Sequence, residues 1–269
     1  MLLLYLFNNP MLIDTHTHLF LPAFNKDRDE VLTRAFNEGV LKCFLPNING
    51  STIGPMLYLV DQYPDNCYPM IGLHPTSVKG DPAGELKNLR DWLSKRKFYA
   101  IGETGLDLYW DTTYLEEQKE AFTFQIRLAK EFDLPVVIHS RESFNEIFDI
   151  LDQENDPNLT GIFHSFTGTP EQAERIIGYG FKIGIGGIIT YKNAGLDRVA
   201  EQIDPGHLVL ETDSPYLAPV PQRGKRNEPS YLPYIAEKTA EIYRMSVGEI
   251  TRITTLNAAH VFRINIPVL

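Results

Sequence analysis

The sequence has few cysteines, no long hydrophobic run and a shortage of positive charge. Its 269 residues include two cysteines, Cys43 and Cys67, which provide neither a disulfide framework nor the spacing of a metal-binding motif. The formal net charge is −10, so the protein as a whole repels polyanions. Any contact with nucleic acid must therefore come from a local basic patch or from bound metal. The cysteine usage fits the reducing cytoplasm, where we expect this protein to reside.

The first ten residues hold a short apolar stretch without a preceding basic region or a small-residue cleavage site. They are too few to cross a membrane and lack the parts of a secretory signal peptide. We interpret residues 1–10 as a dispensable N-terminal extension, and a membrane anchor is the less favoured alternative. No linker or low-complexity tract divides the rest of the chain, so residues 11–269 are expected to form a single domain.

Eight short apolar runs alternate with amphipathic segments along the chain. We expect strands at residues 12–19, 40–46, 68–74, 98–103, 135–139, 161–164, 181–186 and 208–213. We expect helices at 27–39, 52–63, 83–96, 116–133, 143–153, 170–179, 193–202 and, with a break near Ser246, 231–262. This alternation predicts a (β/α)8 TIM barrel, somewhat distorted. A doubly wound open sheet is the alternative, but its site would normally lie at one switch point instead of drawing on many strands.

Residues with metal-binding side chains end most of these runs. The set comprises five of the seven histidines and two carboxylates, namely His16, His18, His74, His139, His164, Glu103 and Asp213. In a barrel, the carboxyl ends of the strands meet at one face, where active sites are built. Imidazole nitrogens mixed with carboxylate oxygens favour Zn, Mn, Fe or Co. The pattern therefore predicts a metal-dependent hydrolase.

The first and fourth strands carry the strongest part of this pattern. Asp14, His16 and His18 alternate along the first strand, so we expect all three on one side, with the two histidines sharing a metal ion. Glu103 lies between glycines that we expect to let the backbone approach a ligand closely. A turn-capping role is the alternative for Glu103, but its carboxylate is the best candidate to bridge two cations. Asp107 is expected to be a loop or supporting residue.

The remaining strand ends supply a second group. His139 and His164 can together hold a second ion, although either alone is compatible with a buried structural histidine. Asp213 is assigned as a metal ligand and the general base, while Glu211 is expected to make a deeper hydrogen bond. For His74 we favour contact with the substrate over direct metal binding, because the other six residues already complete two sites.

These motifs, in this order, resemble the TatD-like deoxyribonuclease family, within the amidohydrolase-like metal-dependent hydrolases. The matching stretches are IDTHTHL at 13–19, GLHP at 72–75, GETGLD at 102–107, PVVIHSRE at 135–142, HSFTG at 164–168, ETDSPYL at 211–217, RGKRNEP at 223–229 and TTLNAAHVF at 254–262. The resemblance implies a distorted TIM barrel whose one to three metal ions hydrolyse phosphodiesters in DNA. It also implies one metal ion at His16, His18, Glu103 and Asp213, and a second at Glu103, His139 and His164.

We therefore predict a deoxyribonuclease, an exonuclease that acts on single-stranded DNA or 3′ ends. Two divalent ions, chosen from Zn, Mg and Mn, would activate water, and a third could accompany the substrate. Asp213 would act as the base and Glu103 as the bridge between the ions. We expect no membrane contact and no obligate protein partner.

Cationic residues beside the predicted barrel mouth are the other candidate substrate contacts. Arg141 lies two residues after His139, and a cluster of Arg223, Lys225 and Arg226 follows the eighth strand. We expect these residues to hold phosphates, although a solvated charge run is the alternative for the cluster. The same metal site could instead act on another ester, an amide or a D-aminoacyl-tRNA. A barrel that binds nucleic acid without cutting it is the alternative from another class.

Overall fold

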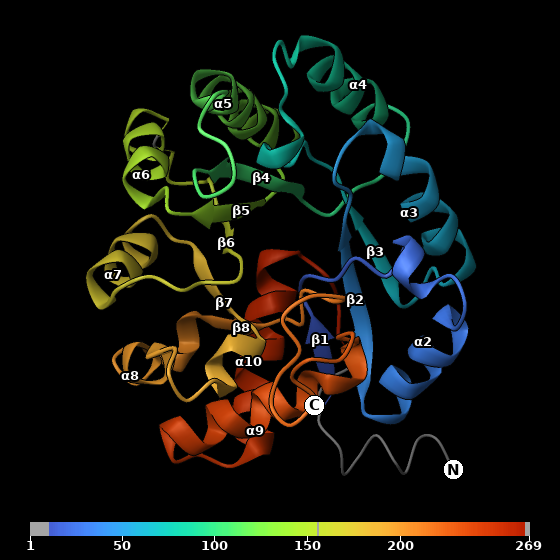
Figure 1. Ribbon diagram of the computed structural model, residues 1–269, viewed down its shortest axis with the longest axis vertical. Helices are drawn as coiled ribbons and strands as arrows, with labels where there is room; N and C mark the ends of the chain where they lie inside the picture. The colour runs from blue at the N-terminus through green and yellow to red at the C-terminus, as the bar shows by residue number, and fades with distance from the viewer. Residues whose placement is uncertain (1–10, 155, 267–269) are drawn as a thin grey trace.

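In the part of the chain that the structure describes, eight parallel strands surround a common centre and helices cover them from outside (Figure 1). The computed structural model describes residues 11–154 and 156–266, so the predicted extension at 1–10 lies outside the described residues. The strands are β1 (Leu12–Asp14), β2 (Val40–Pro46), β3 (Cys67–Met70), β4 (Ile101–Asp107), β5 (Val136–Arg141), β6 (Gly161–Phe163), β7 (Lys182–Ile185) and β8 (Leu208–Leu210). Each observed strand overlaps one of the eight predicted runs.

Two isolated β-bridges join two sheets into a closed barrel. Strands β1 to β3 form one parallel sheet, and β4 to β8 form another. An isolated parallel bridge between Ile71 and Ile101 links the end of β3 to β4. A second bridge, between Thr17 and Ser214, joins the segments that follow β1 and β8. An open sheet would leave two free edges, so the closed ring excludes the doubly wound alternative and confirms the distorted (β/α)8 barrel.

The helices follow the predicted order with small changes in length. The α-helices are α2 (Arg28–Asn37), α3 (Gly50–Gln62), α4 (Ala83–Leu93), α5 (Leu115–Phe132), α6 (Phe144–Gln153), α7 (Pro170–Gly178), α8 (Leu196–Ala200), α9 (Leu232–Tyr243) and α10 (Val247–Val261). Short 3-10 helices are η1 (Pro22–Phe24), η2 (Pro75–Ser77), η3 (Gly187–Thr190), η4 (Pro205–His207) and η5 (Pro229–Tyr231). Within residues 11–154 and 156–266, no helix is both long and apolar enough to cross a membrane.

Two of these helix boundaries follow from local backbone geometry. Helix α8 starts later than predicted because Gly195, directly before it, has a φ of 73°, which a right-handed helix cannot contain. The predicted break near Ser246 is confirmed, because Arg244 ends α9 in the left-handed conformation. Ser246 then begins α10 with a capping box, in which its hydroxyl accepts the N–H of Glu249 at 3.2 Å.

Alternation along the strands sorts the apolar core into two layers. An inner cluster takes residues such as Phe44, Val137 and Val209 from β2, β5 and β8. The C-terminal end of α10 belongs to this cluster, and the Phe262 ring stacks on Phe44 with ring centroids 3.6 Å apart. The neighbouring strand residues, such as Leu45, pack with the surrounding helices in a larger cluster.

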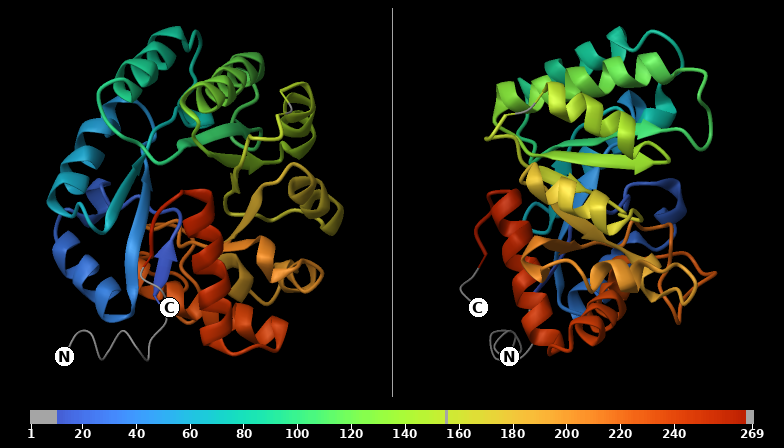
Figure 2. Two further views of the ribbon diagram at one scale, coloured as in Figure 1. Left: turned by 180° about the vertical axis from the view of Figure 1, so that it is seen from behind. Right: turned by 90° about the vertical axis from the view of Figure 1, so that its left-hand side faces the viewer.

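Helix α10 closes the amino end of the barrel, lying across the ring when the molecule is seen from behind (Figure 2). The Thr255 hydroxyl donates to the carbonyl of Met11, just before β1, at 2.7 Å. The Asn257 amide donates to the carbonyl of Leu208, at the start of β8, also at 2.7 Å. With the amino end covered by apolar packing, the carboxyl end is the open face available for a polar site.

We expect Phe262→Ala to lower the free energy of unfolding by about 3–5 kcal/mol, because the stack on Phe44 would leave a cavity in the inner cluster. Chemical denaturation measures this loss. Tyr58→Ala, at an exposed position of α3, is the matched control and should cost far less. Since Phe262 lies at the end opposite the polar site, the metal content of the folded variant should not change. A loss of under about 1 kcal/mol would contradict the role of α10 as the closing element.

Candidate metal centre

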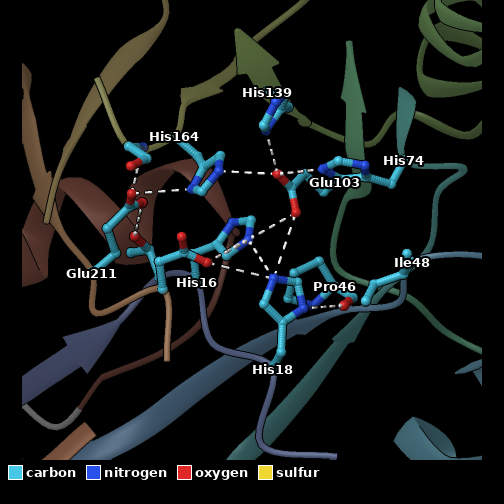
Figure 3. A network of polar contacts seen from close by, with 12 residues as sticks. His16, His18, Pro46, Ile48, His74, Glu103, His139, His164 and Glu211 are labelled. Carbon is cyan, nitrogen blue, oxygen red and sulfur yellow. Dashed lines mark hydrogen bonds and ion pairs between the residues drawn. The ribbon is translucent and has the colours of Figure 1, made fainter. Parts of the chain in front are cut away.

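Glu103, on β4, is the centre of a cluster of imidazoles at the carboxyl end of the barrel (Figure 3). Its Oε2 atom lies 3.1 Å from His16 Nε2 and 3.6 Å from His18 Nε2. Its Oε1 atom lies 2.8 Å from His139 Nδ1 and 3.0 Å from His164 Nε2. The two oxygens of one buried carboxylate thus contact different imidazoles, while the ligand atoms of His16 and His164, one from each side, also lie within 4.8 Å of each other and of Glu103. This is the arrangement that a bridging carboxylate requires.

Asp213 joins the group formed by His16 and His18. Its Oδ1 atom lies 3.5 Å from His18 Nε2 and 3.9 Å from His16 Nε2. The backbone of Asp213 has a φ of 55°, a left-handed conformation that aspartate and asparagine tolerate better than most residues. Two hydrogen bonds hold it there, from Asp213 N–H to the His16 carbonyl at 2.9 Å and from Tyr216 N–H to the Asp213 carbonyl at 2.8 Å.

His74 approaches Glu103 from the end of β3. Its Nε2 atom lies 3.3 Å from Glu103 Oε1, and its Nδ1 atom accepts the Thr76 N–H at 3.1 Å. A neutral imidazole that accepts at Nδ1 carries its proton on Nε2, so in this tautomer His74 is a donor toward the site. In the other tautomer, Nε2 is free to bind a cation, and His74, Glu103 and His139 then form a third group of possible ligands. The first tautomer favours contact with the substrate.

Further contacts orient three of the imidazoles. Asp107 Oδ2 lies 3.0 Å from His139 Nε2, and Glu211 Oε1 lies 3.1 Å from His164 Nδ1. The Nδ1 atom of His18 lies 3.2 Å from the carbonyl oxygen of Pro46. Such partners fix the ring orientation and tautomer of metal-binding histidines. Asp107 and Glu211 therefore support the centre, as their sequence positions predicted.

Burial and charge act against one another on the pKa values of this cluster. Burial lowers the pKa of His16, since the charged imidazolium is poorly solvated there. At His164 burial acts in the same direction, but the carboxylates of Glu103 and Glu211 outweigh it and hold the pKa well above its usual range. Burial would raise the pKa of Glu103, yet the surrounding histidines, His74 first, hold it well below its usual range. Glu103 is therefore a carboxylate at neutral pH.

The first strand is shorter than predicted, and it ends at Asp14. The expectation of one alternating strand over 12–19 is wrong, because the His16 N–H donates to the Asp14 carboxylate at 3.3 Å and not to a neighbouring strand. Thr17 N–H donates to the carbonyl of Phe44 at 3.0 Å, and the His16 carbonyl accepts the Asp213 N–H. The Asp14 carboxylate accepts the backbone N–H of Thr212 at 2.9 Å, and Asp14 belongs to none of the possible ligand groups. Burial raises the pKa of Asp14 to about 7.

The glycines beside Glu103 bring β4 close to β5. A Cβ atom at Gly105, whose φ is 135°, would lie 2.1 Å from the carbonyl oxygen of His139. A Cβ atom at Gly102 would lie 2.7 Å from Val137 Cβ. The prediction that these glycines let the backbone approach a ligand is therefore wrong, since the neighbouring strand occupies the space. Strand β4 also continues to Asp107, so Glu103 lies within it and not at its end.

The cationic residues predicted to hold phosphates are separated in the structure. Arg226 donates two hydrogen bonds to the Asp27 carboxylate, at 2.6 and 2.8 Å, and one to the Ala23 carbonyl at 2.7 Å. These contacts join the loop after β8 to the segment around η1, so Arg226 has a structural role in holding the two segments together. The Arg223 guanidinium lies 4.4 Å from the ring centroid of Tyr191.

The two other cations lie in exposed positions. Lys225 donates to the side chain of Gln222 at 2.8 Å. Arg141 ends β5, and its guanidinium lies 4.1 Å from the ring centroid of Tyr109. The sequence analysis did not single out Tyr109 or its neighbour Trp110, although two adjacent aromatic residues one position beyond the GETGLD stretch were a visible signal.

The fold and the cluster together define a (β/α)8 barrel with a histidine and carboxylate centre at the carboxyl ends of its strands, where barrel enzymes place their active sites. The family model described as TatD related DNase matches residues 13–263. The chain therefore belongs to the TatD related DNase family, which confirms the resemblance seen in the motifs.

Similar proteins align with this chain over nearly the whole length of both. The uncharacterized metal-dependent hydrolase YabD of Bacillus subtilis is 40% identical over 256 residues, covering 95% of this chain and 100% of that protein. The 3′-5′ ssDNA/RNA exonuclease TatD of Erwinia tasmaniensis is 34% identical over 262 residues, covering 94% and 100%. The crystal structure of YjjV, a TatD homologue from Escherichia coli K12, matches with a TM-score of 0.89 at 32% identity, covering 94% and 98%.

We expect Gly105→Ala to destabilise the fold by about 1–3 kcal/mol, because the added methyl overlaps the His139 carbonyl. Displacement of His139 should also lower the metal content. Denaturation curves and elemental analysis of the purified variant measure both effects. Gly178→Ala, where a Cβ atom meets nothing within 4 Å, is the matched control and should be neutral or slightly stabilising. Unchanged metal content in Gly105→Ala would show that the close contact with β5 does not position His139.

Proposed function

We propose that this protein is a metal-dependent nuclease that hydrolyses phosphodiester bonds in DNA, as an exonuclease acting on single strands or 3′ ends. The observation that carries the proposal is the placement of Glu103, whose two oxygens face separate groups of imidazoles. Membership of the TatD related DNase family supports it. The exonuclease name of the Erwinia relative supports a nucleic-acid substrate and adds RNA to the polymers to be tested.

The donor types present, imidazole nitrogens and carboxylate oxygens in several overlapping groups, suit divalent cations, and the proposal uses two of them. His16, His18 and Asp213 each offer a ligand atom within 4.8 Å of the others. Together with Glu103 Oε2 they would hold one ion, while His139, His164 and Glu103 Oε1 would hold the second. Imidazole and carboxylate donors suit Zn or Mn better than Mg alone. When bound, such ions lower the pKa of water and neutralise charge on the phosphate oxygens.

Asp213 would act as the general base. Burial acts to raise the pKa of Asp213, but the nearby imidazoles, His18 first, lower it overall, so the group is a carboxylate at neutral pH. It would orient the attacking water and accept its proton as the new oxygen–phosphorus bond forms and the bond to the leaving oxygen breaks. The Nε2–H of His74 would donate to a phosphate oxygen. Glu103 keeps both imidazole groups at fixed separation throughout.

The direct test incubates the metal-stripped protein with single-stranded DNA, duplex DNA and RNA, each labelled at the 5′ end, with Mg, Mn or Zn restored separately. We expect progressive shortening from the 3′ end of single strands in the presence of metal only. Parallel reactions with a small carboxylic ester, an amide and a D-aminoacyl-tRNA test the alternative substrates of the same centre. Hydrolysis of one of these, with every nucleic acid left intact, would overturn the nuclease proposal.

We expect Asp213→Asn to keep the fold and to lower kcat on DNA by about 10²–10⁴-fold, the usual contribution of a general base. Asparagine tolerates the left-handed backbone at this position, but its amide cannot accept the proton. Rates under saturating substrate, with circular dichroism as a check on folding, make the measurement. Asp149→Asn, at an exposed position of α6, is the matched control. A kcat within a few-fold of the wild type would rule out Asp213 as the base.

We expect the basic residues after β8 to divide into two kinds. The double variant Arg223→Ala/Lys225→Ala should bind single-stranded DNA more weakly. The slope of log affinity against log salt concentration should also become shallower by about 0.7 per lost phosphate contact. Arg226→Ala should mainly destabilise the fold, because it removes both of the hydrogen bonds that Arg226 makes to the Asp27 carboxylate. Binding across a salt series and thermal unfolding separate the two effects. If Arg226→Ala alone reproduced the binding loss with unchanged stability, the structural task assigned to Arg226 would be wrong.

A further inference from the structure

Two exposed aromatic side chains lie beside the metal centre. Tyr109 and Trp110 directly follow the residue after β4 and are 50% and 69% exposed. Their rings are 4.9 Å apart between centroids and nearly perpendicular, at 86°. Such rings hold large apolar surfaces in water, and tyrosine and tryptophan are enriched where proteins bind partners or ligands. The pair at the open end of the barrel is therefore a candidate surface for binding a ligand.

Asp107 fixes the aromatic pair relative to the centre. Its Oδ1 atom accepts the N–H of Tyr109 at 3.1 Å and the N–H of Trp110 at 3.2 Å. Its Oδ2 atom lies 3.0 Å from His139 Nε2. One carboxylate thus holds both the backbone of the pair and an imidazole that faces Glu103. The backbone of the pair cannot move far from the centre without breaking these contacts.

Arg141 adds a cation to the same surface. Its guanidinium carbon lies 4.1 Å from the ring centroid of Tyr109 and 5.3 Å from that of Trp110. The side chain is exposed, and no ion pair links it to a carboxylate within residues 11–154 and 156–266. Strand β5 places Arg141 two residues beyond His139 on the same strand. A ligand that reaches from the centre to the rings would therefore meet a cation that lies over the Tyr109 ring and is not neutralised by a carboxylate of the described residues.

We propose that Tyr109 and Trp110 form a stacking platform for the bases of a single-stranded nucleic acid, with Arg141 holding an adjoining phosphate. The proposal rests on the proposed nuclease function and names how its substrate is held. Stacking of a base on an aromatic side chain does not depend on sequence, and it needs a base whose faces are free. In a duplex those faces are covered by the neighbouring bases. The platform would therefore select single strands over duplexes.

The kinetic test compares a short single-stranded oligonucleotide with an abasic oligomer that has the same backbone and no bases. In the wild type, the base-containing substrate should have the lower KM. In the variant Tyr109→Ala/Trp110→Ala, KM for that substrate should rise about 5- to 150-fold, the range for loss of one stacked base, while KM for the abasic oligomer stays within about twofold. The single variant Trp110→Phe keeps an aromatic ring at this position, so it should retain most of the KM difference between the base-containing and the abasic substrate. Tyr58→Ala, at an exposed aromatic residue of α3, is the control and should change neither the KM for the base-containing substrate nor the KM for the abasic one.

Fluorescence gives a second readout that does not require turnover. The chain has two tryptophans, so Trp92→Phe leaves Trp110 as the only one. Oligo(dT) added to the metal-stripped Trp92→Phe protein should quench this emission, and the abasic oligomer at the same concentration should not.

The outcomes separate the two proposals. Absence of cleavage of every nucleic acid by the wild type would overturn the nuclease function, whereas quenching of Trp110 by oligo(dT) would still support the platform. Cleavage with equal losses on base-containing and abasic substrates would overturn the platform and leave the nuclease intact. Absence of quenching would also count against the platform, as would an unchanged preference for bases in the double variant. In either case the exposed pair would be a surface for another kind of partner, such as a protein.

Discussion

The structure depends on one buried carboxylate, that of Glu103. A charged carboxylate removed from water is stable only when other groups replace its hydration. Here five histidines surround its two oxygens, and the electrostatic effect of the histidines outweighs the cost of burial. Because these histidines come from segments that follow or lie within β1, β3, β5 and β6, the carboxylate can be compensated only after the barrel has closed. The same geometry leaves each oxygen facing a separate group of possible metal ligands.

A second set of contacts makes this arrangement rigid. Asp107 and Glu211 hold the far sides of two imidazoles, and the Pro46 carbonyl holds a third. Each partner fixes which ring nitrogen points at the centre and holds the ring in its orientation. Asp107 also binds the backbone of the exposed aromatic pair. The orientation of the centre and the shape of its rim are therefore set by the same side chain.

The apolar packing that supports the fold and the polar cluster of the candidate site lie at opposite ends of the barrel. Helix α10 and Phe262 close the amino end with apolar packing, while the polar cluster occupies the carboxyl end. The polar cluster gathers histidines and carboxylates whose charges are balanced mainly by one another. Apolar burial at the amino end is of the kind that offsets such costs. This division allows residues of the site to serve binding and catalysis while the fold is supported elsewhere.

The sequence by itself determined the barrel and which side chains gather in the polar cluster at its carboxyl end. Eight apolar runs with histidines and carboxylates near their ends lead to one polar face, because the carboxyl ends of parallel strands meet whatever the local details. Only the tertiary structure decided that β1 ends at Asp14, that Gly105 makes room for the His139 carbonyl, and that Arg226 pairs with Asp27. Each of these results depends on a contact between segments distant in the chain. Local patterns carry no information about such contacts, whereas the period of a strand and the direction of its ends are local properties.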